Sequence, residues 1–456
     1  MNLHNLKAGE KMTKRYNILL IIFIILIACN ASFVYASYPS PEISAPNAIL
    51  IDYTTGKVLY EKNAHKPAYP ASTTKVMTAI LVLENADLNE VITITEDLYV
   101  DGASMYLLKG ESFSVGELLK VLLIRSANDV AEVLAKHVSG SIEAFANLMN
   151  KRARELGALN TNFTNPHGLP DENHLTTAYD LALIAKHGMS FDLFREIVST
   201  SRLTIEATEF TPENRYYRNS NKFLWATGAS NQIHYDGKYI NIKYDIVDGI
   251  KTGYTSDAQH CLISSSYAGD HRLIAVVLGS QGPNLYSDSR RLIDYGYDNF
   301  QLIQLADKSS FKTTAILKNA VEENIFLYID ESLNTTLSKN FDINDLNEEI
   351  IIYEDIKAPI SPGDVLGMLV YSVGDQVVAT SDLISKDMIA RKTLLQKVKI
   401  PSNIFLKILL VFLLWQILVI YLRVKKGRIR RKTSSQYASS YKFSKNLLKS
   451  SSYRKR

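Results

Sequence analysis

The chain has 456 residues, enough for two or three domains. Hydrophobic residues make up 46% and charged residues 21% of the sequence, which is typical of folded, soluble protein. The net charge of +4 hides an asymmetry, because residues 423–456 hold thirteen Lys or Arg and no acidic residue, whereas residues 17–422 have a net charge of −12. This pattern argues against a nucleic-acid-binding body and for charge sorted across a membrane.

The N-terminal residues predict a secretory signal peptide at residues 1–36. Lys14 and Arg15 precede a short apolar run, Ile18–Ala28, and small residues then lead to Val34-Tyr35-Ala36. A basic segment, an apolar segment and a small-x-small site are the three parts of such a signal. The apolar run is short for a bilayer span, so we expect cleavage after Ala36. Attachment of a lipid to Cys29, which ends a lipobox-like Leu-Ile-Ala-Cys, stays open as an alternative.

The first part of the body predicts a β-hairpin followed by a helix. Two strand-like runs, Ala48–Tyr53 and Val58–Glu61, flank the turn residues Thr54-Thr55-Gly56-Lys57. Ser72 then opens a stretch with helical apolar periodicity. The apolar residues of that stretch are Val76, Met77, Ile80, Leu81 and Leu83.

Capping residues predict a series of helices after this one. Ser114-Val115-Gly116-Glu117 is a capping box that starts a helix at Val115–Ile124, and Asp129–Val138 is a second helical run. Ser126-Ala127-Asn128 therefore lies on a short turn between two helices. A third helix begins after Ser141 and ends at Gly157, and Thr177 with Asp180 caps a fourth.

The pattern changes to strands after about residue 200. Leu203–Phe210, Cys261–Tyr267 and Leu273–Leu278 are β-rich, and an amphipathic helix is predicted at Asn284–Phe300. Because the helices are enclosed by early and late strands, we expect a layered α+β domain at residues 37–305. Short strands with turns at residues 311–385 predict a separate, small all-β domain at residues 306–396.

A transmembrane helix is predicted at residues 403–422, where Lys407 is the only charged residue and lies near one end. Within twenty residues of the helix there are eight basic residues after it and five before it. This bias places the basic tail, residues 423–456, in the cytoplasm, and the signal peptide independently places the body outside. We therefore expect a single-pass protein of the cell membrane.

Cys261 is the single cysteine beyond the predicted signal peptide, so no intramolecular disulfide is expected. It is interpreted as a small, buried apolar residue at the start of a strand, and the neighbouring His260 as structural. No spacing of His, Cys and acidic residues suggests a metal site, and neither a metal nor a cofactor is expected.

The first motif with chemical content is Ser72-Thr73-Thr74-Lys75. Residues i and i+3 of a helix lie on one face, so the Lys75 amine would lie beside the Ser72 hydroxyl. A serine needs a base to become a nucleophile, and Lys75 can be that base only if burial and nearby positive charge lower its pKa. Lys251 could supply the charge. The backbone N–H of Ser72 would face a developing oxyanion.

Two further motifs complete the set. Ser126 and Asn128 alternate on their turn, so both side chains can reach one cleft, where the serine can relay a proton and the amide can hold a substrate amide. Lys251-Thr252-Gly253, at a strand edge, offers an ammonium and a hydroxyl for a substrate carboxylate. Its glycine would let a peptide lie against the strand.

In this order the three motifs resemble the S-x-x-K, S-x-N and K-T-G signature of penicillin-recognising serine enzymes. Over residues 40–305 the chain resembles the serine D-alanyl-D-alanine carboxypeptidases, the low-molecular-mass penicillin-binding proteins of peptidase family S11. The sequence similarity to that family extends beyond the three motifs. It includes Pro70–Lys75, Asn165–Leu169, Thr177–Leu181 and Asp248–Gly253.

The resemblance implies a penicillin-binding or β-lactamase-like transpeptidase domain, with helices and an antiparallel sheet. It implies removal of the terminal D-alanine from peptidoglycan stem pentapeptides through an acyl-enzyme, with β-lactams as covalent inhibitors and no nucleic acid as partner. Ser72, Lys75 and Ser126 would be catalytic, as nucleophile, general base and proton relay. The substrate-binding residues would be Asn128, Lys251, Thr252, Gly253 and Tyr254, the last through its backbone N–H as second oxyanion donor.

Three alternatives stay open at this point. A D,D-endopeptidase acting on peptidoglycan cross-links would use the same residues. A class A-like β-lactamase is disfavoured, because no matching Glu-x-x-x-Asn loop follows the S-x-N motif. A non-catalytic wall-binding protein is disfavoured by the intact motifs. The chain departs from the family in two places: the stretch Ala226–Tyr244 is longer than usual, and the predicted anchor is a full spanning helix.

Overall fold

The computed structural model describes residues 39–393 and 402–450, and it describes side chains up to residue 430. Contacts divide the chain into two compact units. The first runs to residue 308 and includes residues 331–349 and 370–380, and the second holds residues 309–330, 350–369 and those from 381 onward. The predicted signal peptide, with Cys29 and Ala36, lies outside the described residues, and the predicted domain boundaries stay a prediction.

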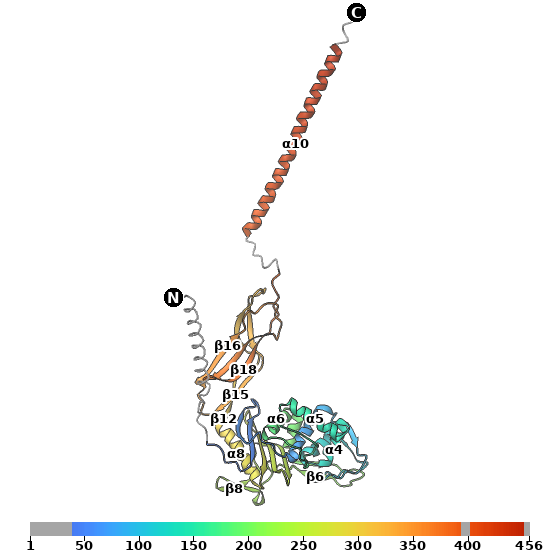
Figure 1. The fold of residues 1–456 in the computed structure, drawn as a ribbon, viewed down its shortest axis with the longest axis vertical. Coiled ribbons are helices and arrows are strands. Elements are labelled where there is room, and N and C mark those ends of the chain that lie inside the picture. The colour runs from blue at the N-terminus through green and yellow to red at the C-terminus, as the bar shows by residue number, and fades with distance from the viewer. Residues whose placement is uncertain (1–38, 394–401, 451–456) are drawn as a thin grey trace, which may run out of the picture. The chain divides into compact units, whose positions relative to one another are not determined.

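The first unit is built on a five-stranded antiparallel sheet in the order β2-β1-β11-β10-β9 (Figure 1). The predicted hairpin is confirmed as the pair β1 and β2, and β1 also pairs with β11, so strands from both ends of this unit meet. β9 is left at the edge of the sheet. The bounds are Asn47–Asp52 for β1, Val58–Lys62 for β2, Val247–Thr255 for β9, Gln259–Ala268 for β10 and His271–Ser280 for β11.

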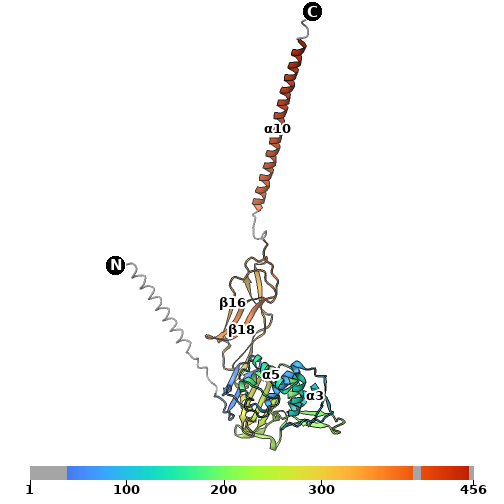
Figure 2. The same cartoon turned by 45° about the vertical axis from the view of Figure 1, so that its right-hand side comes forward.

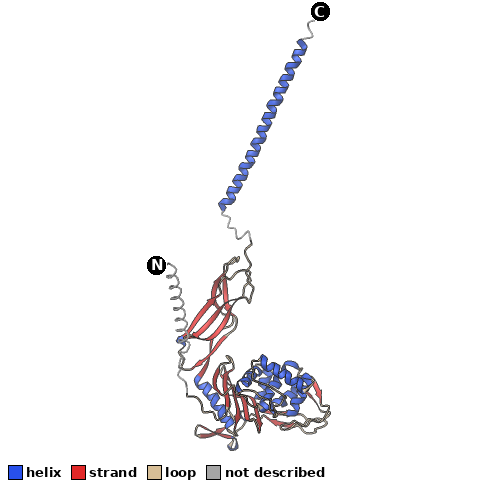
Figure 3. Cartoon of the chain, in the orientation of Figure 1, coloured by secondary structure: helices blue, strands red, loops and turns tan. Residues whose placement is uncertain are grey.

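Helices cover both faces of this sheet (Figure 3). Alternating residues of each strand point to opposite faces. In β1, Ile49 and Ile51 join the core beneath helices α2 to α7, whereas Ala48 and Leu50 join the core beneath α8. The helices are α2 Lys75–Asn85, α3 Val115–Ile124, α4 Asn128–Ser139, α5 Ile142–Glu155, α6 Ala178–Gly188, α7 Asp192–Ser199 and α8 Asn284–Asn299.

Most of the predicted helix caps are present. Ser114 forms the full capping box with Glu117, and the Ser141 hydroxyl accepts the backbone N–H of Ala144. The Thr177 hydroxyl accepts the backbone N–H of Asp180, as expected of an N-cap. The expectation that the Asp180 side chain also caps this helix is wrong. Its carboxylate instead accepts the backbone N–H of Asn160 and the hydroxyl proton of Thr161, so it ties α6 to the 160–161 loop.

Three antiparallel strand pairs also belong to the first unit. The predicted strand Leu203–Phe210 is too long, because β5 ends at Ile205. Thr208 and Thr211 then form a turn whose hydroxyls donate to the buried Glu111 carboxylate, 2.7 and 3.0 Å away. The pairs are β3 Val91–Thr93 with β4 Ser112–Ser114, β5 Arg202–Ile205 with β6 Arg215–Arg218, and β7 Gln232–Tyr235 with β8 Lys238–Asn241.

The C-terminal strands confirm the predicted all-β domain. A two-stranded sheet pairs β12 with β15, and a five-stranded sheet has the order β13-β14-β18-β17-β16. The bounds are β12 Phe300–Ala306, β13 Phe311–Ile316, β14 Asn324–Ile329, β15 Leu333–Ser338, β16 Leu346–Ile352, β17 Val365–Val373 and β18 Gln376–Ser385.

A single continuous helix, α10 Ser402–Ser450, ends the described chain (Figure 2). Its segment Asn403–Arg430 has a mean hydropathy of 2.5 over its best window and none of that window is buried. By length and composition this segment can cross a membrane, and it contains the predicted span at residues 403–422. The helix therefore fits a membrane anchor.

The capping box gives a first stability prediction. Replacing Ser114 with alanine removes the acceptor for the Glu117 backbone N–H at the start of α3. We expect Ser114→Ala to lower the free energy of unfolding by about 1 kcal/mol, measured by urea denaturation. Thr227→Ala, at an exposed loop position, is the control and should change the free energy by less than about 0.5 kcal/mol. Equal effects of the two substitutions would contradict the assigned cap.

Candidate active site

Ser72 and Lys75 lie side by side, but on a tighter turn than the sequence predicts. Ser72 belongs to a 3₁₀ helix, η1 Ala71–Thr74, and α2 begins only at Lys75. A 3₁₀ helix has three residues per turn, so residues i and i+3 are eclipsed. The Lys75 Nζ atom therefore lies 2.9 Å from the Ser72 Oγ atom.

The Lys75 amine is fully buried and has three polar neighbours. Besides Ser72, these are the Asn128 Oδ1 atom at 2.6 Å and the His167 carbonyl oxygen at 2.8 Å. The last two can only accept hydrogen bonds. A neutral amine has two N–H donors for them and one lone pair, which faces the Ser72 hydroxyl. The arrangement therefore fits a neutral lysine poised to take the serine proton.

Burial is the main reason why the pKa of Lys75 lies well below its ordinary value, and the charge of Lys251 lowers this pKa further. The Asp129 carboxylate acts in the opposite direction and raises it. The sequence-based requirement for burial and a nearby cation is thus met at this position.

Asn128 orients the amine. Its Nδ2 atom donates to the carbonyl oxygen of Asp101, which leaves Oδ1 facing Lys75, so the two ends of the amide cannot be exchanged. Its backbone N–H donates to the carbonyl oxygen of Ala103 at 2.7 Å. In the described structure Asn128 therefore binds the lysine and the 101–103 loop, in addition to lining the cleft.

The segment Asn165–Leu169 closes the other side of Lys75. The His167 carbonyl accepts from the amine, and the carbonyl of the preceding Pro166 accepts the Thr78 hydroxyl at 2.6 Å. Gly168 has φ +84°, and a Cβ atom there would lie 1.8 Å from the Ala71 carbonyl oxygen. Only glycine allows this loop to approach the turn that carries Ser72.

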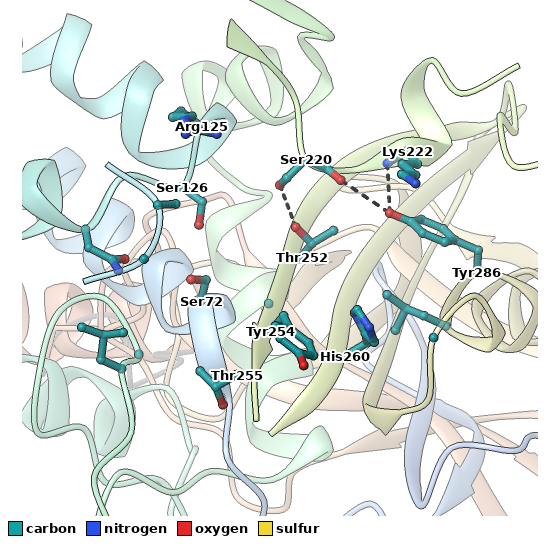
Figure 4. A pocket seen from close by; sticks show the side chains of 18 of the residues that line it. Ser72, Arg125, Ser126, Ser220, Lys222, Thr252, Tyr254, Thr255, His260 and Tyr286 are labelled. Carbon is teal, nitrogen blue, oxygen red and sulfur yellow. Dashed lines mark hydrogen bonds between the residues drawn. The ribbon is translucent and has the colours of Figure 1, made fainter. Parts of the chain in front are cut away.

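Ser126 occupies the turn between α3 and α4, as predicted. Its φ of +67° places a non-glycine residue in the left-handed region, where strain is held by the surrounding structure. The hydroxyl lies on the same side of the cleft as Ser72 (Figure 4). A group bound in the cleft could therefore contact both hydroxyls.

Asp129 is a residue that sequence reasoning did not single out. Its fully buried carboxylate accepts from the Ser104 hydroxyl at 2.7 Å and from the backbone N–H groups of Met105 and Leu107. The carboxylate thus fixes the 104–107 loop against the start of α4. The sequence signal for Asp129 is its position directly after the S-x-N motif. Its structural role could not be predicted from the sequence, because these loop partners lie more than twenty residues away.

The third motif lies within the edge strand β9. Lys251 is 1% exposed, and burial lowers its pKa to about 7. A Cβ atom at Gly253 would lie 3.0 Å from the Ser72 backbone nitrogen, so the glycine is needed for the Ser72 turn to pack on β9.

The neighbouring residues of β9 contact other parts of the cleft wall. Thr252 donates its hydroxyl proton to Ser220 Oγ at 2.6 Å. The Tyr254 ring stacks on His260, with centroids 4.6 Å apart.

These elements surround a cleft of 610 Å³ (Figure 4). Of the predicted site residues, all except the buried Lys75 and Lys251 line it. Sequence reasoning missed Arg125, Ser220, Lys222 and Tyr286, which lie on its walls. The remaining lining residues are Gly102, Ala103, Gly168, Leu169, Ile242, Thr255, His260, Gly282, Pro283 and Leu285.

Cys261 takes no part in this site. It is buried at the start of β10, as expected, and burial raises the pKa of its thiol to about 12. Among the described residues, no group of three His, Cys, Asp or Glu side chains is arranged to hold a metal ion.

Comparison with known proteins gives consistent matches. Residues 34–282 match the family model described as D-alanyl-D-alanine carboxypeptidase, and residues 300–391 match the C-terminal domain of penicillin-binding protein 5. The chain is 33% identical over 350 residues to D-alanyl-D-alanine carboxypeptidase DacF of Bacillus subtilis, covering 75% of this chain and 85% of that protein. It is 30% identical to DacC of Escherichia coli, over 79% and 88% of the two chains.

A solved structure extends the likeness to three dimensions. Penicillin-binding protein 5 from Haemophilus influenzae superposes with a TM-score of 0.66 at 26% identity, covering 78% of this chain and all of that one. On this chain the two family matches follow one another in the order that the sequence predicts, a larger N-terminal domain and then a small C-terminal domain.

The close approach of Gly168 gives a second stability prediction. Gly168→Ala should destabilise the protein by about 1–3 kcal/mol more than Gly140→Ala. Both glycines have positive φ, +84° and +79°, so both variants carry the left-handed backbone cost of about 1–2 kcal/mol. A Cβ atom at Gly140 meets nothing within 4 Å, so Gly140→Ala isolates that cost. Equal melting temperatures for the two variants would show that the 165–169 loop does not press on the Ser72 turn.

Proposed function

Because this chain belongs to the D-alanyl-D-alanine carboxypeptidase family, whose members act on peptidoglycan peptides and bind β-lactams, we propose that Ser72 is its acylated nucleophile and Lys75 the general base. The substrate is the terminal D-alanyl-D-alanine of a stem pentapeptide. The observation that supports these roles is the 2.9 Å contact between the Ser72 hydroxyl and the buried amine of Lys75, whose pKa burial lowers.

Acylation begins when Lys75 takes the proton of the Ser72 hydroxyl. The serine oxygen then attacks the carbonyl carbon of the penultimate D-alanine, and the carbonyl oxygen acquires negative charge. The backbone N–H groups of Ser72 and Tyr254 stabilise this oxyanion. Gly253 supports the arrangement, because it lets the Ser72 turn and β9 approach closely enough for both donors to face one atom.

The leaving group departs with a proton. Ser126 relays a proton from Lys75 to the nitrogen of the terminal D-alanine, the C–N bond breaks, and D-alanine leaves as the free amino acid. The peptide remains as an ester on Ser72. A water molecule, deprotonated by Lys75, then attacks the ester carbonyl, which releases the shortened peptide acid and regenerates the serine.

The edge strand sets the direction of the substrate. The terminal carboxylate binds at Thr252 and Lys251, and the scissile carbonyl lies between Ser72 and Tyr254. The substrate therefore runs along β9 with its C-terminus toward Thr252 and its N-terminus toward Thr255, antiparallel to the strand. Asn128 uses its remaining amide N–H for a substrate carbonyl. An arriving carboxylate stabilises the charged form of Lys251, whose own pKa is about 7.

The apolar helix and the distribution of charge together support a location at the cell membrane. The segment Asn403–Arg430 anchors the protein in the cell membrane with a single span. The catalytic unit lies outside, where peptidoglycan is found, and the basic tail lies in the cytoplasm.

The nucleophile is tested by covalent labelling. The wild-type protein should be labelled by fluorescent penicillin, and Ser72→Ala should not, because the ester to Oγ cannot form. Labelled protein is read by denaturing gel electrophoresis. The control is Ser199→Ala, at an exposed helix end, which should be labelled like the wild type. Stable labelling of Ser72→Ala would remove the assignment of the nucleophile.

The role of Lys251 is tested by the pH dependence of acylation. Lys75 reacts only when neutral, so the acylation rate rises as pH rises through the pKa of Lys75. In Lys251→Ala, Lys75 loses a repelling cation and holds its proton more tightly. The acidic limb of the acylation rate plotted against pH should therefore move to higher pH. Loss of a charge-assisted contact should also lower kcat/KM about ten- to hundredfold, on the order of 1.5–3 kcal/mol.

Lys251→Arg is the matched variant, because it keeps the charge and changes the shape. In Lys251→Arg the acidic limb should return part of the way to its wild-type pH, and a smaller part of the wild-type kcat/KM should be restored. In the wild type, kcat/KM for the D-alanyl-D-alanine peptide should fall above about pH 7, where the free Lys251 loses its proton. An unchanged profile in Lys251→Ala would show that this residue has neither role.

A further inference from the structure

A buried imidazole lies close to the pocket of the Lys75 amine, and the proposed mechanism does not use it. His174 is 1% exposed and lies on the loop that precedes α6. The backbone after it is fixed, because Thr176 exchanges two hydrogen bonds with Ala68. The imidazole packs on the Phe163 ring, with centroids 5.5 Å apart. The position of the imidazole is therefore set by backbone pairing and by ring packing.

Both ring nitrogens of His174 have partners, and these partners determine which nitrogen carries the proton. The backbone N–H of Thr164 donates to the Nδ1 atom at 3.0 Å, and a backbone N–H can only donate. Nδ1 is therefore unprotonated. The neutral ring then carries its proton on Nε2, which donates to the Thr74 hydroxyl oxygen at 2.9 Å. The hydrogen-bond network thus assigns a single tautomer to this histidine.

The surroundings of His174 keep the ring uncharged. Burial is the main reason why its pKa is lowered to about 4. Among the titratable groups around it, His167 and Lys75 lower this pKa further, Asp171 raises it, and Asp257 lines the same small cavity. At neutral pH the ring is therefore uncharged, so a change in the pH profile of acylation reports on Lys75 and not on His174.

The two partners of the ring belong to two different walls of the Lys75 pocket. Thr74 directly precedes Lys75 in the chain and is fully buried in η1. Thr164 lies three residues before His167, whose carbonyl oxygen accepts from the Lys75 amine. His174 thus connects the turn that presents the amine to the loop that accepts its hydrogen bond.

The space beside the ring is small. His174 lines, together with Ala71 and Gly168, a cavity of about 10 Å³, which has room for no more than one water molecule. A shorter or displaced side chain at position 174 would enlarge this space next to the Ser72 turn. Because the low pKa of Lys75 depends on burial, water that enters there would raise it.

We propose that His174 is a positioning residue for the general base: its neutral ring joins Thr74 to Thr164 and so holds the two walls of the Lys75 pocket at the spacing that acylation requires. The inference rests on the proposed function, since it gives His174 an effect only through Lys75. Among the described residues, the ring hydrogen-bonds to Thr74 and Thr164 and to no residue of β9. We therefore expect changes at position 174 to slow acylation and to leave ligand binding unchanged.

Three substitutions separate the two contacts of the ring. His174→Leu fills much of the space and removes both hydrogen bonds. His174→Asn can still accept the Thr164 N–H but is too short to reach Thr74, whereas His174→Gln can reach Thr74 but leaves the Thr164 N–H without its acceptor. The control is His234→Leu, at an exposed position on β7. Acylation by fluorescent penicillin is followed at several penicillin concentrations and normalised to the fraction of protein labelled at saturation, so misfolded protein is not counted.

In His174→Leu the acylation rate constant at saturating penicillin should fall about ten- to hundredfold, the loss expected when a reacting group is displaced by about 1 Å. The dissociation constant of penicillin before acylation should stay within about twofold of the wild type. The acidic limb of the acylation rate plotted against pH should move to higher pH by about one unit, because Lys75 is less well shielded from water. His174→Asn and His174→Gln should each lie between the wild type and His174→Leu, and His234→Leu should match the wild type.

Thr74→Val tests whether the effect passes through the turn. It replaces the hydroxyl group with a methyl group and leaves His174 in place, so acylation should slow and the acidic limb should again move to higher pH. The double variant His174→Leu/Thr74→Val should react within about twofold of His174→Leu, because both substitutions remove the same hydrogen bond. Additive losses, or a wild-type rate in Thr74→Val, would overturn the assigned path.

Two further results would overturn the inference. One is a wild-type acylation rate in His174→Leu, and the other is a slower rate with an unmoved acidic limb, the result expected of a purely structural residue. If His174→Leu gives no labelled protein at saturation, His174→Asn and Thr74→Val supply the same test. In all these outcomes the wild type is labelled and releases D-alanine from diacetyl-lysyl-D-alanyl-D-alanine, so the proposed function stands. A wild type that does neither would refute the proposed function itself.

Discussion

The burial of one amine organises this active site. Lys75 is withdrawn from water and held by Ser72, Asn128 and His167, which come from three separate segments of the chain. Removing an ammonium group from water is costly, and this cost favours the neutral form that can accept a proton. Three further features keep this amine away from water and directed at the serine. They are the close approach of the Gly168 loop, the Asp101 carbonyl that orients Asn128, and the loop that Asp129 fixes.

The edge strand β9 forms a second constraint on this cleft. An edge strand has backbone groups that no neighbouring strand uses, so a peptide can add to it. Gly253 brings the Ser72 turn against the same strand, and Thr252 continues the cleft toward Ser220 and Lys222. Two walls of the cleft, the Ser72 turn and the segment that carries Ser220, therefore pack against neighbouring residues of one strand.

Local patterns were the most reliable guide to the fold. The capping box at Ser114 and the cap at Thr177 depend on neighbouring residues, and both are present. The predicted role of Asp180 and the predicted strand at residues 203–210 failed for a shared reason. In each case polar side chains bind partners distant in sequence: Asp180 binds the 160–161 segment, and the 208–211 turn binds Glu111. A pattern of adjacent residues contains no information about such partners.

By itself the sequence determined the order of the three motifs, the chemistry that their side chains can perform, and the adjacency of Ser72 and Lys75, because three residues in a tight turn place them together. Tertiary structure alone decided that Lys75 is fully buried, that the His167 carbonyl and Asn128 point its lone pair at the serine, and that Arg125 and Lys222 line the same cleft. The physical reason is that burial and electrostatic potential are properties of the packed surroundings, and His167 reaches Lys75 across 92 positions of the chain.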